Sequence, residues 1–200
     1  MDIEKNITEQ IRASMHVKEA ILADPRLIAV IGRAARTVTE AYEAGKKTLL
    51  AGNGGSAADA QHIAGEFVSR FRFDRPGLAS VALTTDTSIL TAIGNDYGYD
   101  ELFARQIQAQ GAESDVFIGI STSGNSGNLV RALAVCREKG IRTIGLTGAD
   151  GGVMAGLCDV PIRVPSSDTP RIQESHILIG HILCGIVEEA VFGDLKPVRY

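Results

Sequence analysis

Apolar residues recur at helical spacing in the first part of the chain. Four of them follow one another at intervals of four and predict a helix over residues 3–22: Ile3, Ile7, Ile11 and Met15. Asp24 and Pro25 then predict the start of a second helix, over about 25–44, because aspartate caps a helix and proline suits its first turn. The chain therefore opens with two helices.

After residue 46 the pattern changes to short, uncharged apolar runs separated by segments of helical character. Such runs are typical of buried strands in a parallel sheet. They lie at Thr48–Ala51, Ala79–Leu83, Val116–Ile120, Thr143–Leu146 and Val160–Val164. The helical segments between them lie at about 55–70, 87–93, 99–110 and 127–139. Because parallel neighbours need a crossover connection, usually a helix, this alternation predicts an α/β fold with helices on both faces of a parallel sheet.

The closing segment, Arg171–Phe192, is apolar over most of its circumference. Its apolar residues include Ile172, Ile177, Leu178, Ile179, Ile182, Leu183, Ile186 and Val187. A helix of this kind must be buried on several sides. We therefore expect a homo-oligomer, in which residues 1–45 serve the assembly and residues 46–200 form the α/β core of one domain.

Composition places the chain among ordinary globular proteins. Its 200 residues, 44% hydrophobic and 22% charged, suffice for one domain with a core and exclude a disordered chain. The net charge of −4, without a block of Lys or Arg, argues against a nucleic-acid partner. Cys136, Cys158 and Cys184 have no metal-ligand spacing and are interpreted as core residues in a reducing compartment.

The hydropathy pattern argues against a membrane protein. The longest apolar stretch, Ile177–Val187, is shorter than the ~20 residues that a span needs, and it contains His181. The first residues lack the basic and then apolar order of a signal peptide. We therefore expect a soluble protein of the cytoplasm.

A glycine-rich turn follows the first predicted strand. Residues 52–56 read Gly-Asn-Gly-Gly-Ser and lead into a helix, where free backbone N–H groups and the positive helix end favour an anion. The other interpretation is a plain strand-to-helix turn with Ser56 as the cap. The turn lacks the lysine of a Walker loop and the glycine spacing of a dinucleotide site.

A second turn, rich in hydroxyl groups, follows the third predicted strand. Residues 121–127 read Ser-Thr-Ser-Gly-Asn-Ser-Gly. Ligands of open α/β sheets bind beyond the carboxyl ends of the strands, so two such turns indicate a site for a sugar phosphate. Serine and asparagine also populate ordinary turns, which explains either turn more easily than both. We expect four hydroxyl groups to hold the phosphate, those of Ser56, Ser121, Ser123 and Ser126.

Histidine and carboxylate side chains lie on two of the predicted helices. His62 and Glu66 are four residues apart, on one helix face. Such a pair is more often a surface hydrogen bond than a metal site, but the apolar residues around it predict a buried helix, and a buried carboxylate needs a partner. Gln173 and His181 lie about 80° apart around the closing helix and ~12 Å apart along it. We interpret His176 as a hydrogen-bonded core histidine.

Two further pairs of polar residues have open interpretations. Asn95 and Asp96 suit hydrogen bonds to a polyol, and suit equally a turn or the cap of the next helix. Arg70 and Arg72 suit a phosphate or a solvated helix end.

Taken together, these segments resemble the sugar-isomerase (SIS) domain family. The matching segments are Gly52–His62, Leu83–Asp86, Ile93–Asp96, Ser121–Ser126 and Arg171–Glu174. The resemblance extends over essentially the whole chain. It implies a five-stranded parallel sheet flanked by helices, a homotetramer with sites shared between subunits, and conversion of sedoheptulose 7-phosphate to glycero-manno-heptose 7-phosphate. That reaction begins heptose synthesis for lipopolysaccharide core or related surface glycans.

The resemblance also implies roles for individual residues. It implies a zinc ion, one per subunit, with ligands at His62, Glu66, Gln173 and His181, and a catalytic base and acid at Glu66 and His181. It implies substrate contacts from Asn53, Gly54, Gly55, Glu66, Asn95, Asp96, Ser121, Thr122, Ser123, Ser126 and Gln173.

The implied reaction suits these groups. It removes a proton from one carbon and returns one to its neighbour, which a carboxylate and an imidazole can do, and a metal on the sugar oxygens lowers the cost of negative charge. A glutamate bound tightly to zinc is a poorer base, and glutamine is an unusual zinc ligand. The residues therefore either alternate between roles or hold a partly structural metal.

Two alternatives involve no catalysis. One is a regulator of the same fold that resembles the initiator-associating proteins of replication, which keep the glycine turn but lack an acid at the position of Glu66. The other is a sugar-phosphate sensor, which needs both turns but no base. The presence of Glu66 favours the enzyme.

Overall fold

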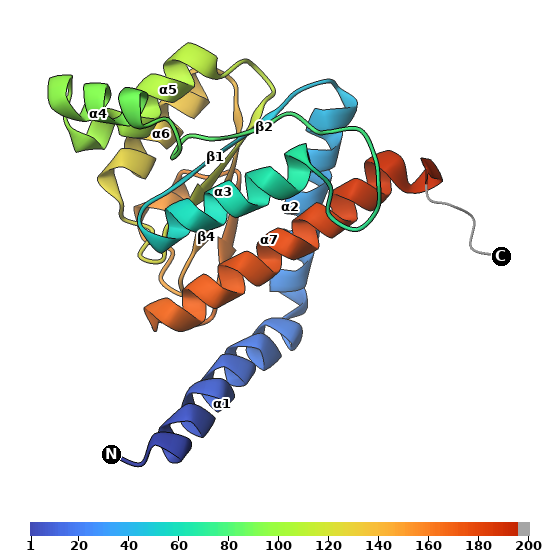
Figure 1. Cartoon of the computed structure of the whole chain (residues 1–200), viewed down its shortest axis with the longest axis vertical. Helices are drawn as coiled ribbons and strands as arrows, with labels where there is room; N and C mark the ends of the chain where they lie inside the picture. Colours follow the sequence, from blue (N-terminus) through green and yellow to red (C-terminus); the bar gives the residue numbers. More distant parts are fainter. Residues whose placement is uncertain (196–200) are drawn as a thin grey trace.

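Five parallel strands form the central layer of the computed structural model, which describes residues 1–195 (Figure 1). The strands are β1 (Thr48–Gly52), β2 (Ser80–Ala82), β3 (Val116–Ile120), β4 (Arg142–Thr147) and β5 (Val160–Arg163). They lie in the order β2-β1-β3-β4-β5. Each begins and ends within one residue of its predicted bounds, so the predicted parallel sheet is confirmed.

Helices cover both faces of this sheet. On one face lie α2 (Pro25–Glu43), α3 (Gly55–Val68) and α7 (Thr169–Phe192), and on the other lie α5 (Leu102–Gln110) and α6 (Gly127–Glu138). Consecutive strand residues point to opposite faces, so Leu50 packs in the core of α2, α3 and α7, whereas Leu49 packs in the core of α5 and α6. This is the three-layer arrangement that the sequence predicts.

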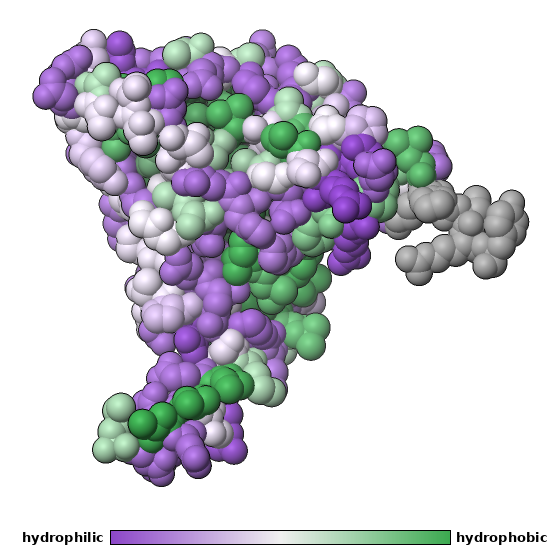
Figure 2. Space-filling model, in the orientation of Figure 1, coloured by the Kyte–Doolittle hydropathy of each residue, from purple (hydrophilic) through white to green (hydrophobic). Residues whose placement is uncertain are grey.

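The two N-terminal helices are also confirmed. Asp24 accepts hydrogen bonds from the N–H groups of Arg26 and Leu27, and Pro25 begins α2. The first helix, α1 (Ile3–Leu22), extends away from the body of the molecule (Figure 1). It carries a stripe of apolar side chains, each more than half exposed, which is visible as a green band in Figure 2: Ile3, Ile7, Ile11 and Met15.

Between residues 87 and 110 the helices differ from those that the sequence pattern predicts. Helix α4 (Thr87–Asp96) runs three residues beyond its predicted end, so Asn95 and Asp96 are its last residues rather than the cap of the next helix. The segment 99–110, predicted as one helix, consists of a short 3₁₀ turn, η1 (Tyr99–Glu101), followed by α5. Over so few residues the two helix types have similar apolar spacing, and the pattern does not separate them.

Helix α7, with the following turn η3 (Gly193–Leu195), is long and apolar enough to cross a bilayer by length and composition alone. The length of the apolar stretch Ile177–Val187 alone does not predict a helix long enough to span, because the helix continues on both sides of that stretch. However, 39% of its most apolar window is buried in the protein. Ile179 and Leu183 lie in the core with α2 and α3. These contacts identify α7 as a core helix.

Candidate active site

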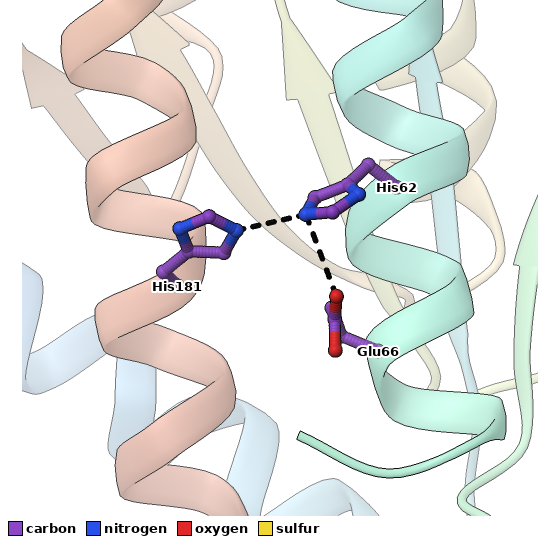
Figure 3. A group of neighbouring side chains, drawn as sticks. All are labelled: His62, Glu66 and His181. Carbon is purple, nitrogen blue, oxygen red and sulfur yellow. Dashed lines mark hydrogen bonds and ion pairs between the residues drawn. The ribbon is translucent and has the colours of Figure 1, made fainter. Parts of the chain in front are cut away.

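Two helices bring three metal-binding side chains together (Figure 3). His62 and Glu66 lie one turn apart on α3, and the imidazole of His181 points toward them from α7. Nε2 of His62 lies 2.8 Å from Nε2 of His181 and 3.4 Å from Oε1 of Glu66. One ligand atom from each residue lies within 4.8 Å of the other two. The packing of α7 against α3 therefore joins residues that are far apart in the sequence.

These three side chains, here called the His-Glu-His group, fit a divalent metal ion. Two imidazoles and a carboxylate form the donor set of many catalytic zinc sites. A zinc ion between both imidazoles needs their nitrogens roughly 3.3 Å apart, at about 2.0 Å per Zn–N bond and a tetrahedral angle. The rings therefore need to separate only slightly. The side chain of His62 is 48% exposed, so an ion can reach the group from solvent.

Asp59 lies one turn before His62 on α3, and nothing in the sequence pattern singles it out. Burial raises the pKa of its carboxyl group, and the charge of neighbouring His62 opposes that rise. Its Oδ2 atom is buried without a hydrogen-bond partner among the residues that the structure describes. An acidic group of raised pKa therefore adjoins the His-Glu-His group.

The glycine turn, residues 52–56, lies where α3 begins and closely approaches α7. Gly54 is the N-cap of α3 with a φ of 57°, a left-handed conformation that favours glycine, so the cap is not Ser56. A Cβ atom on Gly55 would overlap the side-chain amide of Gln173. The amide of Gln173 therefore packs on the first turn of α3, about two helical turns from His62.

Two residues that the sequence did not single out, Asn128 and Tyr99, hold the glycine turn to its neighbour. Asn53 and the buried Asn128, in the first turn of α6, exchange amide hydrogen bonds of 3.0 and 2.9 Å. The hydroxyl group of Tyr99 donates to Oδ1 of Asn53 at 3.0 Å. In the sequence, an asparagine directly after the turn at residues 121–127 suggests an ordinary helix cap, so no distinct sequence pattern marks Asn128. These bonds place the two turns side by side.

The hydroxyl groups of the second turn converge where α6 begins. Oγ of Ser121 lies 2.9 Å from Oγ of Ser126 and 3.4 Å from Oγ of Ser123, and it accepts a hydrogen bond from the N–H of Gly124. Ser126 is the N-cap of α6, but its side chain makes no capping hydrogen bond. A neighbouring cavity of about 240 Å³ is lined by Thr122 and other hydroxyl-bearing residues. Hydroxyl groups at a helix N-terminus suit a phosphate.

The remaining predicted residues occupy different places. Asn95 and Asp96 lie exposed at the end of α4, where the Asn95 amide donates to the Asp96 carboxylate at 2.7 Å. Ser56 is buried in the first turn of α3. Arg70 and Arg72 line a cleft of about 480 Å³ that His62 and Glu66 also line, which places cationic groups beside the predicted metal.

His176 is the core histidine that the sequence favours. It is fully buried, and its Nε2 donates to the carbonyl of Thr147 at 3.1 Å. Burial lowers the pKa of its imidazole to about 4. His176 is therefore neutral at physiological pH and belongs to the core.

The site as a whole is an elongated strip. Because Gln173 packs beside Gly55 and His181 lies beside His62, α3 and α7 run in the same direction. The seven residues from Gly55 to His62 span about 10 Å. The glycine turn is thus separated by that distance, along α3, from the His-Glu-His group.

Comparison with known proteins relates this arrangement to one family. The family model described as the SIS domain matches residues 11–148. The chain is 69% identical over 186 residues to the phosphoheptose isomerase of Aneurinibacillus thermoaerophilus, covering 93% of this chain and 94% of the relative. It is 71% identical over 180 residues to phosphoheptose isomerase 2 of Campylobacter jejuni, covering 90% of each.

Solved structures show the same likeness. A phosphoheptose isomerase from Neisseria gonorrhoeae superposes with a TM-score of 0.88 at 42% identity, covering 94% of this chain and 99% of the other. One from Francisella tularensis superposes with a TM-score of 0.89 at 36% identity, covering 94% and 100%. The fold and the sequence therefore agree over nearly the whole length of the chain.

Proposed function

The chain belongs to the SIS domain family, and from this premise we propose that its His-Glu-His group and two turns together catalyse the conversion of sedoheptulose 7-phosphate to glycero-manno-heptose 7-phosphate. Identity of about 70% over nine tenths of the chain assigns phosphoheptose isomerase activity, an aldose–ketose isomerisation. The reaction is the first step toward activated heptose.

The shape of the site supports this substrate. A seven-carbon sugar phosphate has eight bonds from C1 to phosphorus, which span about 10 Å at the ~1.2 Å per bond of an extended chain. The glycine turn, at Gly55, lies a similar length along α3 from His62. In this proposal the phosphate lies beside the two turns, and C1 and C2 lie at Glu66 and His181. The meeting of His62 and Glu66, on the helix that begins at the glycine turn, with His181 of α7 is the observation that carries the proposal.

Glu66 and His181 then carry the proton transfers. Glu66 as the base removes the proton from C1 of the ketose, which leaves an enediol across C1 and C2, and a proton returns to C2 to form the aldose. His181 as the acid moves the proton between the two sugar oxygens as the carbonyl changes place. The two side chains project into the same space from α3 and α7 (Figure 3).

A bound metal ion completes this site in our proposal. His62, Glu66 and His181 hold the ion, and Gln173 is the proposed fourth ligand once its amide leaves Gly55. We propose zinc, because two imidazoles and a carboxylate suit it. When bound, the ion polarises the sugar oxygens and stabilises negative charge on the enediol.

The backbone and the hydroxyl groups provide recognition. Ser121, Ser123 and Ser126 bind the phosphate together with the N-terminus of α6. Ser56, Thr122 and the glycine turn from Asn53 to Gly55 contact the sugar and its phosphate, and Asn95 and Asp96 reach the hydroxyl groups from α4. We propose that the protein works in the cytoplasm as a homotetramer whose sites combine residues of neighbouring subunits.

The non-catalytic alternatives are not retained. A replication regulator or a sugar-phosphate sensor has no use for a base, whereas Glu66 is present and lies 3.4 Å from His62. The relatives of 55–71% identity are phosphoheptose isomerases.

Incubation of the purified protein with sedoheptulose 7-phosphate tests the proposal, with the aldoheptose product followed by NMR. We expect the aldose to accumulate, with incorporation of solvent deuterium at C2 when the reaction runs in D₂O. A six-carbon ketose phosphate is the matched control and should react more slowly, because it is one carbon shorter. Failure to convert the heptose phosphate would reject the function.

A further inference from the structure

A loop between α3 and β2, residues 69–77, forms one wall of the catalytic cleft. Ser69, Arg70, Phe71 and Arg72 line the cleft together with His62 and Glu66. The ring of Phe71 stacks on the imidazole of His181, with ring centroids 5.6 Å apart and planes 29° apart. The orientation of His181 therefore depends on where this loop holds Phe71.

Glu188 of α7 fixes that part of the loop. Its Oε1 accepts a hydrogen bond from the N–H of Phe71 and its Oε2 one from the N–H of Arg72, each at 2.8 Å. Glu188 lies seven residues after His181, so both side chains project from nearly the same face of α7. Between them, a Cβ atom on Gly185 would lie 3.3 Å from the ring of Phe71, so the loop packs tightly on the helix.

Arg75 connects this carboxylate to the end of α3. Its Nε lies 3.1 Å from Oε1 of Glu188, and both side chains are almost completely buried. Its guanidinium also donates to the carbonyl groups of Glu66 at 2.8 Å and Phe67 at 2.7 Å. Carbonyl groups in the last turn of a helix have no partner within the helix. Arg75 supplies a hydrogen-bond donor to the backbone carbonyl of Glu66, the proposed base.

We propose that Arg75 and Glu188 are positioning residues for the isomerisation: they hold the backbone of Glu66 and, through Phe71, the ring of His181. A buried ion pair contributes little net stability compared with apolar residues of the same volume, whereas its directional bonds fix geometry. The inference rests on the proposed roles of Glu66 and His181. It adds three residues: Phe71, which stacks on the ring of His181, and Arg75 and Glu188, which act through the backbone of Glu66 and of the loop.

The chain offers a matched control for Glu188. The carboxylate of Asp115, in the turn before β3, also accepts two backbone hydrogen bonds, from Lys47 and Ala112, and one from the ammonium group of Lys47. The side chain of Asp115 is as deeply buried as that of Glu188, but it lies at the amino ends of β1 and β3, whereas the two turns lie at their carboxyl ends. Asp115→Asn therefore measures the loss of a comparable network without a catalytic neighbour.

The experiment compares kcat, KM and the melting temperature of the metal-loaded protein. We expect Glu188→Gln to lower kcat by about 10- to 100-fold with KM changed less than about twofold, since a misplacement of ~1 Å can cost about 10²-fold. Asp115→Asn should lower the melting temperature similarly but leave kcat within about twofold. Phe71→Leu should lower kcat about tenfold, and Phe71→Tyr, which keeps the ring, should restore it.

Three results of this experiment bear on the positioning roles of Phe71, Arg75 and Glu188. Equal losses of kcat in Glu188→Gln and Asp115→Asn, or an unchanged kcat in Phe71→Leu, would overturn the inference. If Glu188→Gln does not fold, the comparison of Phe71→Leu with Phe71→Tyr decides alone. A wild-type protein without turnover would instead reject the proposed function, and the positioning roles with it.

Discussion

In the proposed site, single hydroxyl groups of the turn at residues 121–127 should decide how tightly the phosphate binds. Oγ of Ser121 and Oγ of Ser126 lie 2.9 Å apart at the start of α6 and converge on one point. A hydrogen bond to a charged acceptor contributes about 1.5–3 kcal/mol. We expect Ser121→Ala and Ser126→Ala each to raise KM for the sugar phosphate about tenfold or more, with little change in kcat. Initial-rate kinetics measures this, and an unchanged KM in both variants would place the phosphate elsewhere.

One buried residue makes stability depend on pH. Burial lowers the pKa of His176 to about 4, whereas an unfolded histidine has a pKa of 6.5. Between these values the unfolded chain binds a proton that the folded protein does not, so stability falls as the pH falls from 6.5 toward 4. The loss from this group is about 2 kcal/mol at pH 5 relative to pH 7. His176→Gln should lose less stability over that range in chemical denaturation, and an identical pH dependence would contradict the assignment.

The packing of α3 against α7 brings His62, Glu66 and His181 together, and a metal ion would link the two helices. Replacing His62 removes one ligand from α3 and leaves Glu66 and His181 in place. We expect the His62→Gln protein to bind less zinc. Its activity should fall only to the extent that the metal contributes by polarising the substrate. Binding of metal to the folded state alone also raises stability.

The measurements for this variant are metal analysis and the melting temperature with and without a chelator. The chelator should lower the melting temperature of the wild-type protein but not that of His62→Gln. Full zinc content in His62→Gln would show that the ion binds elsewhere.

The elements could be predicted from the sequence, but their side-by-side placement could not. Five uncharged runs mark the strands because a strand buried on both faces excludes charge. The spacing of His62 and Glu66 places them on one face of a helix, which is a local property. The approach of His181 depends on how α7 packs on α3, and no local pattern encodes that distance. Before any contact was known, only the resemblance to a family joined these residues.

Other residues of the site have no sequence signal. Asn128 resembles an ordinary cap residue, and Arg75 resembles one more polar residue of a loop, yet both are buried and fully engaged in hydrogen bonds. Long-range partners of this kind, such as Glu188 for Arg75, become visible only in three dimensions. Gln173 is the opposite case. The sequence predicts it as a metal ligand, whereas the structure places its amide against Gly55.

At the scale of the whole molecule, exposed apolar stripes on two helices indicate assembly. The stripe of α1 described above extends along a helix that projects from the body (Figure 2). On α7, three residues spaced four apart remain more than a third exposed, Leu178, Ile182 and Ile186. Such stripes are typical of interfaces between subunits. We expect a tetramer of about 85 kDa, four times the chain mass of 21.2 kDa.

Light scattering at micromolar concentration tests this expectation. The double substitution Ile7→Lys and Ile11→Lys places two charges in the α1 stripe and should shift the mass toward smaller species. A control with lysines at exposed polar positions of the same helix, Asn6→Lys and Gln10→Lys, should leave the mass unchanged. A stable wild-type monomer would contradict the assembly.

The central claim is that Glu66 transfers the proton in the isomerisation of sedoheptulose 7-phosphate, and its most direct test is the turnover of Glu66→Gln beside that of the wild-type protein. Glutamine keeps the shape of the side chain and an oxygen that can bind a metal, but it is not a base. We predict a kcat about 10²- to 10⁴-fold lower, the contribution of general acid–base catalysis, with an unchanged fold and mass. Near-normal turnover by Glu66→Gln would contradict the account and leave Glu66 as a metal ligand only.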